Sequence, residues 1–82
     1  MMLPPFPRLP FSLNGNTRTA VTDMLAEMID DETAAVSRYK DYAKRAEERG
    51  DNLTAALFNL LSYEEAKHRD VLADRLKKIR KQ

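Results

Sequence analysis

One stretch of this sequence holds residue types that could bind a metal ion. The segment SYEEAKHRD, residues 62–70, contains the only histidine of the 82-residue chain, His68, three positions after Glu65. On a helix, residues three apart project from the same side, so a carboxylate and an imidazole at this spacing can bind one metal centre together. Glu64, four positions before His68, competes for this role, but Glu65 continues the apolar stripe of the helix. We therefore predict Glu65 and His68 as metal ligands.

Two long helices are expected to position these residues. The chain from residue 17 to residue 49 contains neither Gly nor Pro, and a second helical stretch covers residues 52–80. The residues suited to capping these helices are Asn16 or Thr17, Gly50, and Asp51 or Asn52. Because the turn between the helices is very short, they should lie antiparallel. Residues 17–82 are thus predicted to form an all-α helical hairpin.

Both predicted helices carry a stripe of mostly apolar residues at alternating four- and three-residue steps. The first stripe consists of Val21, Leu25, Met28, Glu32, Ala35, Tyr39, Tyr42 and Ala46. The second consists of Phe58, Leu61, Glu65, His68, Leu72, Arg75 and Ile79. Further leucines beside the second stripe widen its apolar face beyond what one neighbouring helix covers. We therefore predict that the hairpin dimerises into a four-helix bundle.

Glu32, Glu65 and His68 interrupt these apolar stripes. Buried carboxylates are costly unless they are paired, hydrogen-bonded or bound to a cation. In an antiparallel hairpin that turns near residues 50–51, Glu32 falls within about one helical turn of Glu65 and His68. A two-fold dimer would then supply four Glu and two His, the ligand set of a di-iron or di-manganese site in a helical bundle. Four carboxylates also balance the charge of two divalent cations.

The segment from about residue 28 to residue 76 resembles one half of a ferritin-like di-iron protein of the rubrerythrin type, similar to the small encapsulated ferritins. The resemblance is carried by Glu32, by Tyr39 with the following DYAKRAEERGD, and by YEEAKHRDVL. It implies that Glu65 bridges two irons, that Glu32 and His68 are terminal ligands, and that Tyr39 packs beside the site. These four are the expected catalytic residues. It further implies a ferritin-like bundle with two irons per dimer at the subunit interface, with manganese as the alternative metal.

The activity implied by the resemblance is that of an oxidoreductase that oxidises Fe²⁺ with O₂ or peroxide. Its role would be that of a ferroxidase in iron storage or in peroxide detoxification. The chain has no cysteine and so lacks the cysteine-bound iron domain of rubrerythrins. An external electron donor is therefore an expected partner. An encapsulating shell protein is another, although the C-terminal RLKKIRKQ does not resemble a shell-docking peptide. The alternative is a non-enzymatic hairpin for oligomerisation or interaction, in which the polar stripe residues fix the register.

Charge and hydropathy argue against other partners. The net charge of +1 gives no pull toward nucleic acid or an anionic membrane. No apolar run approaches the roughly 18 residues that a membrane span needs. Residues 1–16 are read as a Pro-rich extended arm that packs on a neighbouring subunit, because prolines exclude helix and also interrupt any signal-peptide core. We expect a cytoplasmic protein, free or inside a protein nanocompartment.

Overall fold

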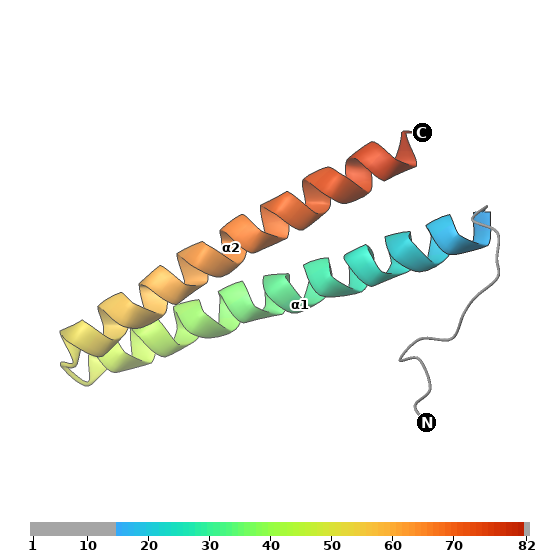
Figure 1. The fold of residues 1–82 in the computed structure, drawn as a ribbon. Coiled ribbons are helices and arrows are strands. Elements are labelled where there is room, and N and C mark those ends of the chain that lie inside the picture. The colour runs from blue at the N-terminus through green and yellow to red at the C-terminus, as the bar shows by residue number, and fades with distance from the viewer. Residues whose placement is uncertain (1–14, 82) are drawn as a thin grey trace, which may run out of the picture.

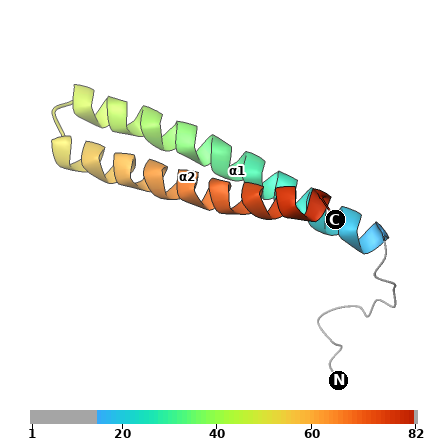
Figure 2. The same cartoon turned by 90° about the horizontal axis from the view of Figure 1, so that it is seen from above.

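The protein folds as a hairpin of two long helices. The computed structural model describes residues 15–81, with side chains from residue 20 onward. Helix α1 (Gly15–Glu48) and helix α2 (Asn52–Arg80) run antiparallel and are joined by a tight turn (Figure 1). The view from above shows that the helices stay side by side as they leave the turn (Figure 2). The expected all-α hairpin is confirmed, whereas its dimerisation into a four-helix bundle stays a prediction.

The observed start of α1 differs slightly from the expected one. The helix begins at Gly15, so the last two residues of the expected extended arm, Gly15 and Asn16, belong to α1. Helix ends commonly vary by one or two residues, and neither residue excludes helix as proline does. The rest of the expected arm, residues 1–14, lies outside the described residues, as does its expected packing on a neighbouring subunit.

The turn is built from two capping motifs that share Asp51. Gly50 has a φ of +83°, and its N–H donates to the carbonyl of Glu47 while the N–H of Asp51 donates to the carbonyl of Ala46, both at 2.9 Å. This pattern is a Schellman motif, which closes the C-terminus of α1. The Asp51 carboxylate then accepts hydrogen bonds from the backbone N–H of Thr54 at 3.0 Å and from its hydroxyl at 2.7 Å. These bonds cap α2 and lower the pKa of Asp51.

The hairpin buries a narrow core of mostly small side chains. The buried apolar residues are Val36, Ala43, Ala55, Leu76 and Ile79. Nearer the turn, Phe58 stacks on Tyr39 with 6.0 Å between ring centroids and meets Tyr42 edge-on at 5.3 Å. Small residues between the helices let the backbones approach, and the aromatic group fills the space that remains.

A large apolar surface remains exposed on the described hairpin. The exposed side chains are Met24, Met28, Tyr42, Leu53, Leu57, Leu60, Tyr63 and Val71. Two helices alone thus leave a large apolar area open to solvent, which favours association with further chains.

Neither α1 nor α2, within the described residues, is long and apolar enough to cross a lipid bilayer.

Candidate metal centre

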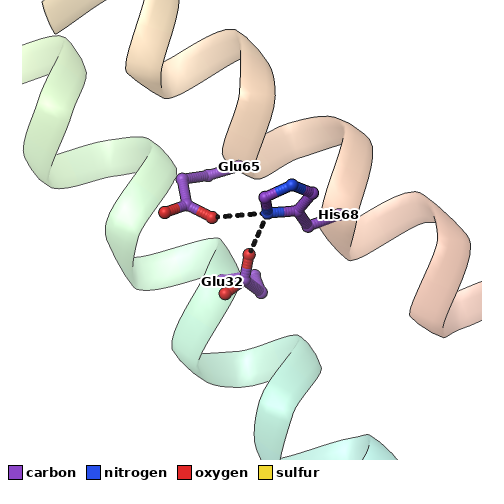
Figure 3. Close-up of side chains that lie close together, drawn as sticks. All are labelled: Glu32, Glu65 and His68. Atoms are coloured by element: carbon purple, nitrogen blue, oxygen red, sulfur yellow. Dashed lines mark hydrogen bonds and ion pairs between the residues drawn. The ribbon is translucent and has the colours of Figure 1, made fainter.

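Glu32, Glu65 and His68 converge between the two helices (Figure 3). Glu32 projects from α1 and the other two from α2, and each offers one ligand atom within 4.8 Å of the others. The Nδ1 atom of His68 lies 3.1 Å from Oε1 of Glu65 and 3.3 Å from Oε2 of Glu32. The convergence expected from the antiparallel register is therefore observed.

The group lies near the middle of both helices. Glu32 is close to the centre of α1 (Gly15–Glu48), while Glu65 and His68 are one turn apart near the centre of α2 (Asn52–Arg80). Free backbone N–H groups, which can neutralise a carboxylate, occur only in the first turn of a helix. Carboxylates at mid-helix therefore need side chains or a cation as partners.

The two carboxylates are enclosed and the imidazole is open. The side chains of Glu32 and Glu65 are 15% and 24% exposed, whereas that of His68 is 66% exposed. The Oε2 atom of Glu32 is buried and has no hydrogen-bond partner among the described residues, and its nearest charged group is the His68 imidazole at 3.3 Å, which pairs with it only when protonated. A buried carboxylate oxygen without a partner is costly, and a cation bound beside it would remove that cost.

The pKa values of all three groups are shifted, because two negatively charged carboxylates lie close together in a partly enclosed site. Hydrogen bonding to Glu65, together with burial, raises the pKa of Glu32, while hydrogen bonding to Glu32 and His68 lowers the pKa of Glu65. Hydrogen bonding to Glu65 raises the pKa of His68. Two neighbouring carboxylates that share a site shift in opposite directions, because both resist being charged together. A divalent cation bound between them would balance the charge of both carboxylates.

The other two candidate residues are Glu64 and Tyr39. Glu64 is exposed and is not one of the three converging residues, which agrees with the choice of Glu65 over it. Tyr39 lies two helical turns from Glu32 and stacks on Phe58. The ligand roles of the three converging residues and the expected role of Tyr39 beside the metal stay predictions.

Sequence reasoning overlooked Ser62, which holds the two ligand-bearing segments together. It is 3% exposed and donates a hydrogen bond to the carbonyl of Val36 at 3.1 Å across the hairpin. Ser62 lies one turn before Glu65, and Val36 lies one turn after Glu32. The seven-residue spacing of the small residues at 55 and 62 is the sequence signal that could have identified it.

The donor set suits iron or manganese. Carboxylate oxygens and imidazole nitrogen bind these metals well, and the three donors leave room for further ligands on the open side. The enclosed carboxylates and the buried Oε2 of Glu32, which accepts no hydrogen bond, both favour a bound cation. The residues present therefore fit a divalent metal of this kind.

Comparison with known families agrees with this geometry. A helical hairpin that carries Glu on one helix and Glu-x-x-His on the other defines half of a ferritin-like di-iron bundle. The rubrerythrin family model matches residues 23–82, which include Glu32, Glu65 and His68. The chain therefore belongs to the rubrerythrin family, a family of ferritin-like di-iron proteins, and the resemblance seen in its sequence is confirmed. Neither the curated proteins nor the solved structures that were searched gave a match.

Proposed function

We propose that two copies of this chain enclose two iron ions and oxidise Fe²⁺ with O₂ or peroxide. The observation that supports this most strongly is the convergence of Glu32, Glu65 and His68, with ligand atoms within 4.8 Å and one buried oxygen that accepts no hydrogen bond. Such a group is costly in a protein that binds no cation. Family membership supports iron as that cation.

The second copy follows from the number of ligands and from the exposed surface around them. One chain offers three donors, fewer than the four to six that iron usually binds, and His68 is open on its outer side. Exposed apolar side chains, among them Met28 one turn before Glu32, lie on the same stripe. A two-fold copy placed on this stripe would cover them and bring a second set of donors. The completed site would hold four carboxylates and two imidazoles around two divalent ions.

Each residue has a proposed role at this site. Glu65 would bridge both ions, as the family resemblance implies, and Glu32 and His68 would each bind one. Iron held there would supply the change between ferrous and ferric states that passes electrons to the oxidant. The surrounding apolar stripe would exclude water, which strengthens the carboxylate interactions. Tyr39 is proposed to act from the neighbouring turns, as the family resemblance implies.

The reaction balances with Fe²⁺ as substrate. Two Fe²⁺ ions each give up one electron, and one hydrogen peroxide takes both electrons and two protons to form two waters. With O₂ as oxidant, the same two electrons and two protons form hydrogen peroxide. Repeated peroxide turnover would draw electrons from an external donor, because this chain holds no cysteine-bound iron. Storage would instead pass ferric ions onward, for which an encapsulating shell is the proposed partner.

The test is an anaerobic titration of the metal-free protein with Fe²⁺, followed by addition of O₂ or peroxide. We expect Fe³⁺ to form faster than in a protein-free blank, with the burst saturating at one iron per chain. Tyr39→Phe should change the rate and leave the bound iron unchanged. A protein that associates without metal and leaves the blank rate unaltered would instead support the hairpin as an oligomerisation module.

A further inference from the structure

A pocket of about 250 Å³ lies between the two helices, on the other face of the hairpin from the metal ligands. Both helices contribute to its walls. The residues that line it around the buried Ser62 are Val36, Lys40, Asn59, Tyr63, Ala66 and Arg69. The proposed iron chemistry uses none of them.

The positions of these residues around α2 show that the pocket and the metal centre occupy different faces. Ser62 is buried against α1, so its direction marks the line of contact between the helices. At about 100° per residue, Glu65 projects about 60° to one side of Ser62, and Asn59 projects about 60° to the other side. Tyr63 lies a further 40° or so beyond Asn59, on the side away from Glu65.

The same division holds on α1, where the buried Val36 faces α2. Glu32 projects about 40° to one side of Val36, and Lys40 projects about 40° to the other side. The antiparallel hairpin brings the metal ligands together on one face and the pocket residues together on the other. A second chain docked over the metal ligands would therefore leave the pocket open on the outer surface of the bundle.

Two cationic side chains line the pocket from opposite ends. Lys40 lies one turn beyond Val36 on α1, and Arg69 lies two turns beyond Ser62 on α2. Side chains on a helix lean toward its N-terminus, and these helices run antiparallel, so both cations reach back toward the level of the Val36–Ser62 hydrogen bond. Among the described residues, no carboxylate lines the pocket. Its charge is therefore positive at both ends.

The polar groups of the pocket are available to a ligand. Within residues 20–81, Lys40 forms no ion pair, and the Arg69 guanidinium is paired only through Nε, at 3.3 Å from Asp70. The Tyr63 hydroxyl and the Asn59 amide add groups that can donate to an anion. Each cation thus has a hydrogen-bonding neighbour that could orient a bound carboxylate.

We propose that this pocket binds a small organic dicarboxylate. Lys40 and Arg69 would each pair with one carboxylate, and the apolar Val36 and Ala66 between them would contact a short hydrocarbon chain. The volume is below the roughly 300–1,000 Å³ of pockets that take drug-sized ligands, which limits the ligand to a small molecule. Binding there goes beyond the proposed function and requires no metal.

Succinate is the probe, titrated into isotope-labelled, metal-free, full-length protein and followed by nuclear magnetic resonance. We expect saturable shifts of backbone signals confined to residues 36–40 and 59–69. Butyrate, which has the same chain length and one carboxylate, should bind about two- to fivefold more weakly, because it pairs with only one exposed cation. The neutral succinamide should leave the signals unchanged. Absence of the succinate shifts would overturn the proposal, as would equal affinities for succinate and butyrate.

A matched pair of substitutions tests the contact with Lys40. Lys40→Gln should weaken succinate binding about two- to fivefold. Lys44→Gln removes an exposed cation one turn further along α1 that does not line the pocket, and it should leave the affinity unchanged. Equal effects of the two substitutions would contradict the assignment. Inorganic phosphate that shifts the same signals as strongly as succinate would also contradict it, because the pocket would then attract any anion.

The pocket and the metal centre can fail separately. Lys40→Gln should keep the iron content of the wild type, because Lys40 lies on the other face of α1 from Glu32. Iron binding without succinate binding would reject only the pocket, whereas succinate binding by a protein that takes up no iron would reject only the metal centre.

Discussion

The turn and the middle of the hairpin differ in how far their polar groups are satisfied by hydrogen bonds within the chain. At the turn, carbonyls at the end of α1 accept hydrogen bonds from Gly50 and Asp51, and the Asp51 carboxylate accepts two more from Thr54. In the middle, the Oε2 atom of Glu32 is buried without a hydrogen bond, and His68 faces outward. One chain thus completes its turn alone, whereas its middle, as we propose, is completed by a cation and a second chain.

The pKa shifts of two acidic residues show the same difference. Donors from Thr54 lower the pKa of Asp51, so this acid is stabilised in its charged form by its own helix. A second carboxylate, that of Glu65, raises the pKa of Glu32, so this acid is disfavoured in its charged form. The two acids are therefore distinguished by the groups that surround them, hydrogen-bond donors at Asp51 and a second carboxylate at Glu32.

The largest expected effect is loss of metal on removing a donor from the middle of the hairpin. Glu65→Ala or His68→Ala should lower iron affinity by more than the roughly 10–100-fold that loss of an outer-shell partner costs. Elemental analysis of protein purified from iron-supplemented medium should find about one iron per chain in the wild type and almost none in these variants. Glu64→Ala, which removes the adjacent exposed carboxylate, is the control and should keep its iron. Equal iron in all four proteins would refute the assignment.

Blocking the second chain should also remove iron, although all donors remain. Met28→Lys places a charge on the exposed stripe one turn before Glu32. The substitution replaces an apolar side chain whose burial against the second chain would contribute about 1.5–3 kcal/mol to the free energy of association. Because the dimer is two-fold symmetric, this contribution is lost twice. Ala34→Lys adds the same charge to an exposed position on another side of α1 and should change neither mass nor iron content. If Met28→Lys retained iron as a monomer, the site would be complete in one chain.

Changes at the turn should reduce stability and leave iron binding intact. Gly50→Ala should lower the free energy of unfolding by about 1–2 kcal/mol, the cost of a left-handed conformation for a residue with Cβ. The added Cβ would have no atom within 4 Å, so backbone conformation alone causes the loss. Urea denaturation of the metal-free protein measures this change in the free energy of unfolding. Gly50→Asn should lose less, since Asn tolerates this conformation better. Equal stability of all three proteins would contradict the role of Gly50.

The smallest expected effect is an acid dependence of stability that comes from Asp51. Its folded pKa is lower than its usual value of about 3.8, so its contribution is present above that pH and is lost as the pH falls through the folded value. Asp51→Asn keeps a side-chain oxygen to cap α2 but does not titrate. The difference in unfolding free energy between the two proteins should therefore shrink on acidification. A difference that stays constant from neutral pH to below the folded pKa would exclude this contribution.

Much of this architecture was predictable because the sequence pattern is regular. Two helical stretches without Gly or Pro and a three-residue turn leave one antiparallel register, and that register alone brings Glu32 to Glu65 and His68. The choice of Glu65 over Glu64 followed from the apolar stripe. These features depend on spacing along helices, which sequence records directly.

Other features depend on side-chain packing that spacing does not determine. The hydrogen bond from Ser62 to the Val36 carbonyl requires a close approach of the two helices at that level. The stacking of Tyr39 on Phe58 depends on how aromatic rings fill the space near the turn. The unpartnered oxygen of Glu32 depends on the rotamers of three side chains. The pairing of chains also depends on side-chain packing, because several stripes of α2 are apolar.

Native mass spectrometry of the iron-loaded protein tests the central claim most directly, because it measures iron and chain number in the same particle. The account predicts that iron appears only in species with even numbers of chains, at two irons for every two chains, and that single chains carry none. Single chains that each hold iron, or paired chains without iron under the same loading, would contradict a metal centre shared between two copies.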